Sequence, residues 1–152
     1  MEDVRKFIVF TLKNQSYGVD VSQVHSIERL QKVTEVPRTA SFIKGVIYLR
    51  GNTIPVIDLR ERLWIGQTDT TDESRFLIVE IKGMQVGLLV DAANEVLDIG
   101  AEAIEPPPEM IAGVEARYLE GVAKLKEELL ILLDLEHILD MEEVQEVKQA
   151  IN

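Results

Sequence analysis

The sequence predicts a mainly β fold built from two tandem copies of one small unit, with short helical turns and a C-terminal helix. Three observations support this prediction. The 152-residue chain is 46% hydrophobic, which is enough to bury a core in one domain or two very small ones. Short runs of β-branched and aromatic residues alternate with turn residues. The chain also matches itself at an offset of about seventy residues, which indicates a duplication rather than a solenoid array.

The duplication is visible in residues that fall in register between the two halves. The offset is 69 in the opening strands (76 − 7) and 76 farther along (121 − 45). The pairs that match in both type and spacing are Phe7 with Phe76, Lys13 with Lys82, Gly18 with Gly87, Gly45 with Gly121, and Asp58 with Asp134. Because glycines and aspartates repeat along with apolar residues, we interpret the halves as two copies of a β-rich unit of about five strands.

Each unit opens with a predicted hairpin. Its strands span 7–12 and 17–21 in the first half and 76–81 and 86–90 in the second, with a polar turn between them. Ser22 and Asp91 then stand where a helix N-cap is favoured, so we expect short helical turns at 23–27 and 92–96. One more extended segment is expected at 33–36.

A second hairpin follows in each unit. Its strands are predicted at 46–49 and 53–57 in the first half and at 122–125 and 129–133 in the second. Gly51-Asn52 suits the tight turn of the first hairpin, whereas Glu127-Glu128 suits its counterpart poorly. Since Pro55 lacks a backbone N–H, it predicts an unpaired edge position.

Asp58 and Asp134 follow these hairpins, and we interpret both as helix N-caps rather than catalytic acids. Asp58 and Glu61 have the spacing of a capping box, in which the acid at the third helical position reaches back to the cap. Single-turn helices are therefore predicted at 59–64 and 135–139.

Two irregular segments and a helix complete the chain. The polar segment 65–74 is the natural connector between halves, and the proline-rich segment 105–109 predicts a stiff exposed loop. Asp140 can cap a helix through Ile151, and the apolar stripe expected to dock this helix on a barrel is Val144, Val147 and Ile151. The neighbours expected to face water are Glu142, Glu143, Glu146 and Lys148.

These elements divide the single domain 1–152 into three parts. The first subdomain is expected at 1–68, the second at 69–139, and the C-terminal helix at 140–152.

Composition and charge exclude several classes of function. Cysteine is absent, which removes disulfides, thiolate metal sites and thiol catalysis and agrees with a reducing compartment. The net charge of -11 disfavours nucleic acid and anionic membrane surfaces as partners. No apolar run approaches the roughly 20 residues of a membrane-spanning helix, and the first residues lack a signal-peptide pattern. We therefore expect a cytoplasmic protein with no direct membrane insertion.

The residues also lack a recognisable catalytic constellation. His25 and His137 are the only histidines, and neither belongs to a motif for a nucleophile or a metal. The sequential pairs Glu127-Glu128 and Glu142-Glu143 point to different sides of their elements, so they make poor dyads or calcium ligands. We therefore predict no enzymatic activity and no cofactor.

Four short motifs are more specific than the composition. They are Tyr17-Gly18-Val19-Asp20, Phe42-Ile43-Lys44-Gly45, Leu49-Arg50-Gly51, and Ile54-Pro55-Val56-Ile57-Asp58-Leu59. On these motifs nearly the whole chain resembles the CheW family, the coupling proteins of bacterial chemotaxis. The resemblance implies two five-stranded SH3-like β-barrels around a shared hydrophobic core. It also implies a non-enzymatic scaffold that joins the CheA histidine kinase to transmembrane chemoreceptors.

The resemblance further implies where partners bind. The cytoplasmic helical hairpin tip of the receptor lies in a groove between the barrels, and the receptor-binding positions carried over by motif are Val24, Ile27, Gly45, Arg50, Gly51 and Val96. The CheA regulatory domain lies against a barrel end, and its implied contacts are Val36, Pro37 and Met110. For Val24, Ile27 and Val96, plain core packing is the alternative interpretation. The segment after Val24, His25-Ser26-Ile27-Glu28, lacks the acid-then-arginine pattern often seen in relatives, so a charge-specific contact is not carried over there.

On this interpretation the isolated protein is a monomer, recruited to membrane receptor arrays through its partners. One alternative is the regulatory domain of a CheA or CheV-type protein. Another, from a different class, is a ligand-binding or enzymatic β-barrel.

Overall fold

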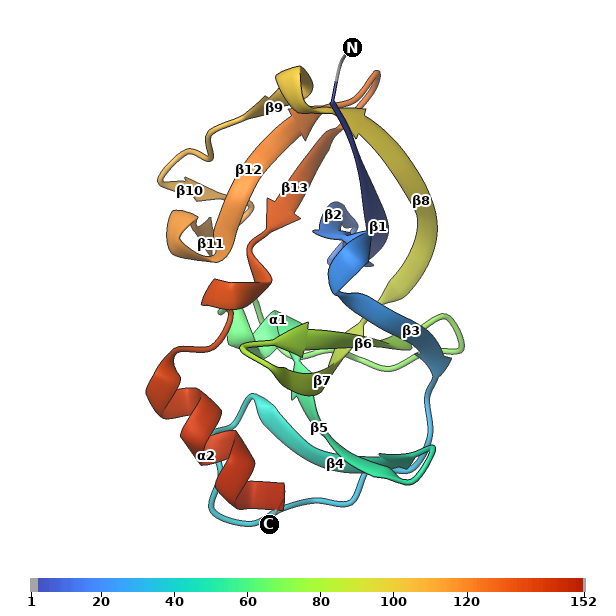
Figure 1. The fold of residues 1–152 in the computed structure, drawn as a ribbon, viewed down its shortest axis with the longest axis vertical. Coiled ribbons are helices and arrows are strands. Elements are labelled where there is room, and N and C mark those ends of the chain that lie inside the picture. The colour runs from blue at the N-terminus through green and yellow to red at the C-terminus, as the bar shows by residue number, and fades with distance from the viewer. Residues whose placement is uncertain (1–2, 152) are drawn as a thin grey trace.

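The computed structural model describes residues 3–151, which form two curled sheets stacked along the long axis of the molecule (Figure 1). The six-stranded sheet has the spatial order β8 (Ala92–Gly100), β1 (Val4–Leu12), β2 (Gln15–Asp20), β13 (Leu129–Leu133), β12 (Leu119–Lys124), β9 (Ile104–Glu105). The five-stranded sheet has the order β3 (Val24–Arg29), β6 (Arg75–Ile81), β7 (Met84–Val90), β5 (Asn52–Asp58), β4 (Ile43–Leu49). The prediction of a mainly β fold is confirmed, although one sheet has a sixth strand.

The remaining elements are short, apart from the C-terminal helix. A small hairpin pairs β10 (Met110–Ile111) with β11 (Val114–Glu115). The helical elements are η1 (Val21–Gln23), α1 (Leu59–Arg62), η2 (Ala101–Ala103), η3 (Ala116–Tyr118), η4 (Leu135–His137) and α2 (Met141–Ile151).

Each sheet closes into a barrel because one edge strand continues along the chain to the opposite edge. β8 passes through η2 into β9, which pairs with β12. In the other barrel the chain leaves β3 and reaches Thr34, which forms an isolated bridge with Val46 of β4. Closure leaves few unpaired strand edges for non-specific pairing.

The two sheets do not coincide with the two halves of the chain. The opening hairpin β1–β2 lies in the six-stranded sheet with β8, β12 and β13 from the second half. The hairpin β6–β7 of the second half lies in the five-stranded sheet with β3, β4 and β5. The predicted subdomains, 1–68 and 69–139, are therefore wrong as a division between barrels. The repeat could not reveal this exchange, because either copy of the hairpin offers similar residues to either barrel.

Gly18 and Gly87 both lie where an exchanged hairpin meets a parallel strand. β2 runs parallel to β13, with Gly18 opposite Leu132, and β7 runs parallel to β5, with Gly87 opposite Val56. A Cβ added at Gly18 would lie 3.1 Å from Leu132 Cδ2, and one at Gly87 would lie 3.6 Å from Val56 Cγ2. The missing side chain thus permits close packing at Gly18, whereas a Cβ at Gly87 would make ordinary van der Waals contact.

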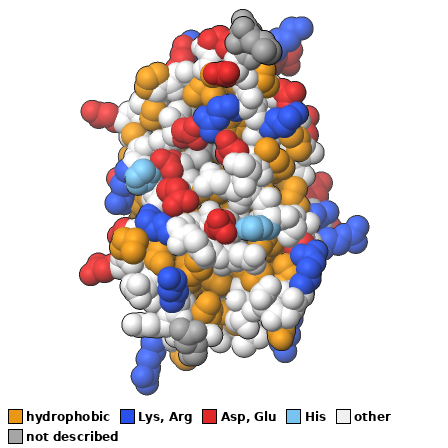
Figure 2. Space-filling model, viewed as in Figure 1, with side chains coloured by type: hydrophobic (Ala, Val, Ile, Leu, Met, Phe, Trp, Pro, Cys, Tyr) orange, Lys and Arg blue, Asp and Glu red, His pale blue; other side chains and the backbone are white. Residues whose placement is uncertain are grey.

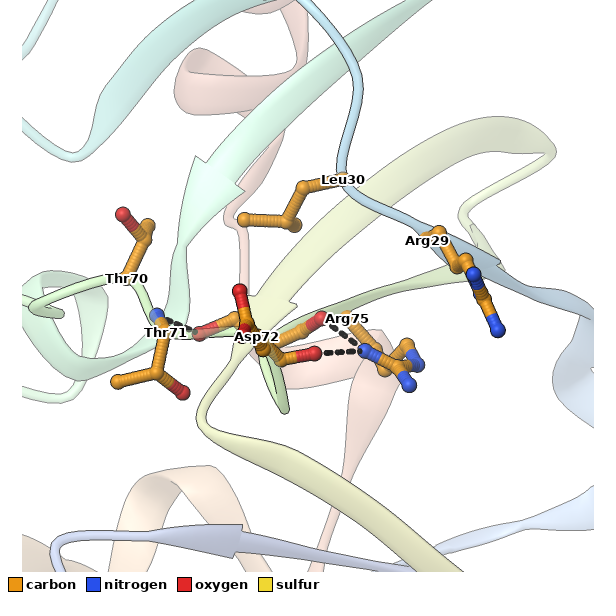
Figure 3. Close-up of a pocket in the computed structure, with 7 residues that line it drawn as sticks. Arg29, Leu30, Thr70, Thr71, Asp72 and Arg75 are labelled. Atoms are coloured by element: carbon orange, nitrogen blue, oxygen red, sulfur yellow. Dashed lines mark hydrogen bonds between the residues drawn. The ribbon is translucent and has the colours of Figure 1, made fainter.

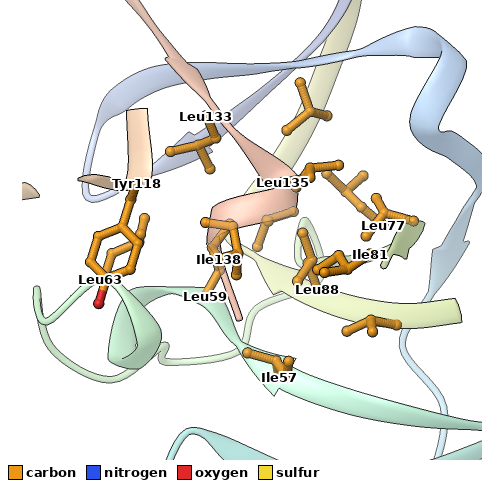
Figure 4. Packing of buried hydrophobic residues seen from close by; sticks show 14 of the residues in the cluster. Ile57, Leu59, Leu63, Leu77, Ile81, Leu88, Tyr118, Leu133, Leu135 and Ile138 are labelled. Atoms are coloured by element: carbon orange, nitrogen blue, oxygen red, sulfur yellow. The ribbon is translucent and has the colours of Figure 1, made fainter. Parts of the chain in front are cut away.

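The largest hydrophobic cluster joins the two barrels, as predicted. It takes Tyr17 and Ile131 from the six-stranded sheet and Leu77 and Leu88 from the five-stranded sheet. Figure 4 shows side chains from β13 and η4 directed toward those of β6 and β7. Since the hydrophobic effect scales with buried apolar area, each barrel is stabilised by the presence of the other.

The helical turns predicted at 23–27 and 92–96 are wrong, because residues 24–27 and 92–96 are strands. β3 pairs with β6 and β8 pairs with β1. The turn that does form is η1, where the Asp20 carboxylate accepts a hydrogen bond from the Ser22 N–H at 2.9 Å. The β-branched residues of both segments favour strands, and cross-strand pairing outweighs the capping signal.

Asp58 and Asp134 cap short helical turns, as predicted. Asp58 is buried and accepts hydrogen bonds from the Glu61 N–H at 3.5 Å and from the Thr68 N–H at 2.9 Å. The Asp134 carboxylate likewise accepts a hydrogen bond from the Glu136 N–H at the start of η4. The capping box is incomplete, because the Glu61 carboxylate pairs with Lys44 instead.

Pro55 lies in an inner strand, contrary to the edge position expected from the sequence. β5 runs between β7 and β4, and Pro55 lies opposite Val46. The backbone N–H and C=O of Val46 bond to Thr34 at 2.8 and 2.9 Å. The backbone groups of Val46 thus form their hydrogen bonds with Thr34 and not with residue 55. Residue 55 therefore needs no backbone N–H to pair with Val46, and proline is tolerated there.

The C-terminal helix begins and docks as predicted. The Asp140 carboxylate accepts a hydrogen bond from the Glu143 N–H at 2.8 Å, and the Asp140 N–H donates to the Glu143 carboxylate at 2.9 Å, which completes a reciprocal capping box. Val144 and Val147 are buried. The helix is therefore part of the core rather than an appendage.

A buried arginine fixes this helix, contrary to the expectation that Glu143 and Glu146 face water. Arg62 is 6% exposed and pairs with the Glu143 carboxylate. Its guanidinium lies 4.8 Å from the Phe42 ring centroid and 5.2 Å from that of Tyr118, whose hydroxyl accepts a hydrogen bond from it at 3.1 Å. The Glu146 carboxylate accepts a hydrogen bond from the backbone N–H of Ala40, in the loop before β4. Helical periodicity alone cannot reveal such partners, because they come from distant segments.

Candidate functional site

Exposed apolar side chains stand at matching positions on the edge strands β3 and β8. Ile27 is 44% exposed and lies opposite Leu77, and Val96 is 52% exposed and lies opposite Ile8. The two positions are 69 residues apart (96 − 27), which is the offset of the duplication. Both side chains are therefore available for contact, and core packing does not explain them.

Val24, in contrast, packs against the shared core. It is half-buried and lies opposite Val79. Its counterpart Ala93 (93 − 24 = 69) packs against the same cluster. Of the three β-branched residues singled out from the sequence, Val24 is thus the one that the core accounts for.

Arg50 and Gly51 are the two central residues of the tight turn between β4 and β5. Their φ values are 48° and 82°, and the flanking residues Leu49 and Asn52 pair with each other. Two consecutive positive φ values are typical of a type I′ hairpin turn, whose twist matches that of the strands. The turn therefore lies one residue earlier than the Gly51-Asn52 predicted from the sequence, and it presents Arg50 to solvent.

Glu28 supplies an acid to Arg50 although segment 25–28 lacks the acid-then-arginine pattern. The Arg50 Nη2 atom lies 3.1 Å from Glu28 Oε2. The pKa of Glu28 is lowered because the Ser26 hydroxyl and the Arg50 guanidinium stabilise its charged form. A hollow of about 190 Å³ adjoins this pair, lined by His25, Ser26, Leu49, Arg50, Asn52, Ile54, Ile78 and Gln85.

Gly45 is buried and is explained by a backbone crossing. Its φ is 144°, and an added Cβ would lie 2.1 Å from the carbonyl oxygen of Thr34. At its counterpart Gly121, a Cβ would lie 2.6 Å from the carbonyl oxygen of Glu105. Both glycines let the closing segment of a barrel cross a strand, so Gly45 supports the Arg50 hairpin from within the fold.

The three residues implied in kinase binding are not brought together. Val36 is half-buried and Pro37 is exposed, and both line a hollow of about 210 Å³ beside Glu146 and Gln149 of α2. Met110 is 57% exposed on β10. Figure 1 shows β10 beside the six-stranded sheet, at the opposite end of the molecule from the C-terminus of α2. These residues therefore mark two surfaces, one on each barrel.

Sequence reasoning missed two further features of the surface. A hollow of about 610 Å³ lies between the end of β3 and the connector before β6. Its lining residues are Arg29, Leu30, Thr70, Thr71, Asp72, Ser74 and Arg75 (Figure 3). Trp64, which was expected inside a helical turn, follows α1 with a φ of 64° and is 73% exposed. The hollow could have been found from the sequence by comparing Arg29 and Arg75 with their counterparts Asp98 and Lys6, since the arginines break the repeat there.

The described residues hold no assembled metal site. No group of three or more His, Asp or Glu side chains that could bind a metal occurs within residues 3–151. His25 lies 3.7 Å from Glu80, and His137 lies 2.6 Å from Asp134, both as exposed pairs. No helix between residues 3 and 151 is long and apolar enough to cross a membrane. On the face shown in Figure 2, acidic and basic side chains are interspersed among apolar ones.

Residues 6–143 match the family model of the CheW-like domain. The chain belongs to the CheW-like family. It is 40% identical to the chemotaxis protein CheW of Klebsiella aerogenes, in a match that covers 92% of this chain and 84% of that protein. The CheW of Bacillus subtilis is also 40% identical, over 92% of this chain and 90% of the relative.

The solved structures agree with this assignment. The crystal structure of the scaffolding protein TtCheW from Thermoanaerobacter tengcongensis matches with a TM-score of 0.85 at 38% identity, covering 94% of this chain and 92% of that one. Chemotaxis protein CheV3 of Helicobacter pylori is 30% identical over 82% of this chain, but the match covers only 41% of that protein. The CheW proteins are therefore matched along more of their length than CheV3.

The family settles the class of function. CheW proteins are scaffolds in bacterial chemotaxis and not enzymes, and their role is to couple chemoreceptors to CheA. The chain is accordingly a non-enzymatic chemotaxis scaffold, and the alternative of an enzymatic barrel is wrong.

Proposed function

We propose that this protein couples chemoreceptors to CheA through two separate surfaces. The receptor surface consists of Ile27, Val96 and the Arg50-Gly51 turn, and it receives the helical hairpin tip of the receptor. The observation that carries this proposal is the exposure of two apolar side chains at equivalent positions of both barrels, 44% at Ile27 and 52% at Val96.

A helix suits this receptor surface on physical grounds. Apolar side chains on a helix recur at spacings of about three and four residues, so one face can contact Ile27 and Val96. Arg50 adds a charge that is 68% exposed at its side chain although it pairs with Glu28. Val24 and Gly45 shape the surface from within, since Val24 packs on the core and Gly45 admits the Thr34 crossing.

The kinase surface is proposed at the barrel ends marked by Val36, Pro37 and Met110. The exposed Met110 on one barrel, and the exposed Pro37 beside the half-buried Val36 on the other, can each contact a homologous barrel, as expected of the CheA regulatory domain. The protein would work in the cytoplasm, reach receptor arrays through its partners, and be monomeric alone.

Arg50→Glu tests the receptor surface. The change reverses a mostly exposed charge and sets it against Glu28, so we expect weaker receptor binding and lower kinase activation. The fold should persist, because exposed ion pairs contribute only about 0.2–1 kcal/mol. Binding to a receptor cytoplasmic fragment and receptor-dependent autophosphorylation of CheA are the measurements.

Lys126→Glu is the matched control, because it makes the same charge change in the turn that corresponds to that of Arg50 (126 − 50 = 76). It should leave coupling intact. Unchanged activation by the Arg50→Glu protein would remove Arg50 from the receptor surface. Failure of the wild-type protein to bind either the receptor fragment or the CheA regulatory domain would overturn the proposed function itself.

A further inference from the structure

Two arginines face each other at the end of β3 and β6. Arg29 lies directly opposite Arg75 across the two strands. Arg29 is exposed and Arg75 is half-buried, and neither forms an ion pair with a carboxylate of residues 3–151. Arg75 Nη1 instead donates to the backbone carbonyls of Asp72 at 2.8 Å and Ser74 at 2.7 Å (Figure 3). The structure thus places two arginines at paired positions of neighbouring strands, without a carboxylate partner among residues 3–151.

The other barrel shows what the same position looks like when it is compensated. The counterpart of Arg29 is Asp98 (98 − 29 = 69) and that of Arg75 is Lys6 (75 − 6 = 69). Lys6 and Asp98 lie opposite each other on β1 and β8, and their charged atoms are 3.0 Å apart. The fold therefore accepts an opposite-charge pair here, and the arginine pair is not required by the backbone.

Composition makes the arginine pair more unusual. The chain has 27 acidic residues against 16 lysines and arginines. Like charges directly opposite each other on neighbouring strands are destabilising. Since acids are abundant and the equivalent position uses one, we propose that Arg29 and Arg75 bind carboxylates of a partner, namely an acidic amphipathic helix that docks along β3.

The spacing on β3 fits such a helix. Ile27 and Arg29 are both exposed and, being two residues apart on a strand, project from the same face about 6.6 Å from each other. Residues four apart on a helix are separated by about 6 Å along its axis. A helix that seats an apolar side chain on Ile27 therefore brings an Asp or Glu one turn away over Arg29.

The hollow beside the arginines extends this surface. Its volume of about 610 Å³ leaves room for a partner side chain, and its lining includes Thr70 and Thr71. Hydroxyls can donate further hydrogen bonds to a carboxylate. The inference deepens the proposed function and takes its partner from it, because the acidic helix is assigned to the chemoreceptor hairpin.

Arg29→Asp provides the test, because it copies the compensated pair of the other barrel. The substituted acid would face Arg75 as Asp98 faces Lys6, so the melting temperature should stay the same or rise. Affinity for the receptor fragment at low ionic strength should fall about tenfold or more, since charge-assisted hydrogen bonds are lost. The affinity of the wild-type protein should also fall more steeply with added salt than that of the variant. Lys124→Asp makes the same charge change on β12 and should leave binding unchanged.

A peptide arm separates this inference from the proposed function. Two helical peptides carry a leucine followed four residues later by either Glu or Gln, and binding is followed by chemical-shift changes. The wild-type protein should bind the Glu peptide about tenfold more tightly, and Arg29→Asp should abolish that preference. Equal binding of both peptides, or of the receptor fragment by wild-type and Arg29→Asp proteins, overturns the inference while the proposed function stands. Loss of receptor binding by the wild-type protein, with the peptide preference intact, refutes the proposed function alone.

Discussion

Gly45→Ala is expected to destabilise the protein strongly, although it adds a single methyl group. The added Cβ would lie 2.1 Å from the carbonyl oxygen of Thr34, which real Cβ atoms do not approach. The φ of 144° at this position is also one that alanine rarely adopts. Either the backbone of Gly45 or the Thr34 segment must move.

The expected loss of stability is the sum of two costs, the backbone strain at residue 45 and the broken hydrogen bonds of Thr34. Forcing a non-glycine residue into this backbone region costs about 1–3 kcal/mol. Displacing Thr34 breaks its two hydrogen bonds with Val46, of 2.9 and 2.8 Å, which contribute about 1 kcal/mol each. We therefore expect a loss of roughly 3–5 kcal/mol in the free energy of unfolding, a large share of the 5–15 kcal/mol typical of domains. For a domain of this size the melting temperature should fall by roughly 6–20 °C.

Urea unfolding followed by circular dichroism measures this loss. Gly121→Ala is the comparison variant. Its added Cβ would lie 2.6 Å from the carbonyl oxygen of Glu105, but Gly121 does not have a positive φ. Only the steric clash, and not the backbone conformation, should therefore destabilise this variant. Its loss should be smaller than that of Gly45→Ala. A loss below about 1 kcal/mol for Gly45→Ala would refute the reasoning, since it would mean that the crossing relaxes without strain. Reduced receptor coupling in this variant should track the unfolded fraction.

Two further predictions concern buried charged and polar groups. Glu143→Gln should lower the free energy of unfolding, measured in urea, by roughly 3–5 kcal/mol, because it leaves the buried Arg62 without its counterion. Glu142→Gln, on the exposed side of the same helix, should change it little. Burial raises the pKa of Tyr17 to about 12 from its ordinary 10.0, so the folded state favours the neutral phenol. The stability that the protein gains from the neutral Tyr17 phenol is complete below pH 10. It is lost as the pH rises toward 12, which lowers the free energy of unfolding by roughly 2–3 kcal/mol. Tyr17→Phe should make that decline shallower when unfolding is measured at increasing alkaline pH.

Local chemistry in the sequence predicted the elements that depend on neighbouring residues. The four hairpins follow from alternating strand and turn residues, and the caps at Asp58 and Asp140 follow from side chains that satisfy the first N–H groups of a helix. In these cases the decisive interaction spans only a few residues, so composition over a short window was sufficient.

The failures concern interactions between distant segments. Segment 23–27 follows a good cap, yet it is a strand because β6 offers it a partner. Glu143 lies at a polar helical position, yet it is drawn inward by Arg62. The exchange of hairpins between barrels depends on two parallel pairings, β2 with β13 and β5 with β7, and the repeat makes the exchanged and unexchanged pairings look alike. Among the proposed contacts, the sequence could not distinguish the half-buried Val24 from the exposed Ile27.

The duplication nevertheless gives an internal standard for separating fold from function. Gly45 and Gly121 recur because both barrels need a backbone crossing, and that need is visible in the structure. Arg29 and Arg75 do not recur, and at the equivalent position Lys6 and Asp98 form a pair that serves the fold better. Since the two positions occupy the same place in the repeated hairpin and edge-strand pairing, the like-charge pair is not required by the fold. Such departures, the arginine pair foremost, are where a binding partner should supply the missing interaction.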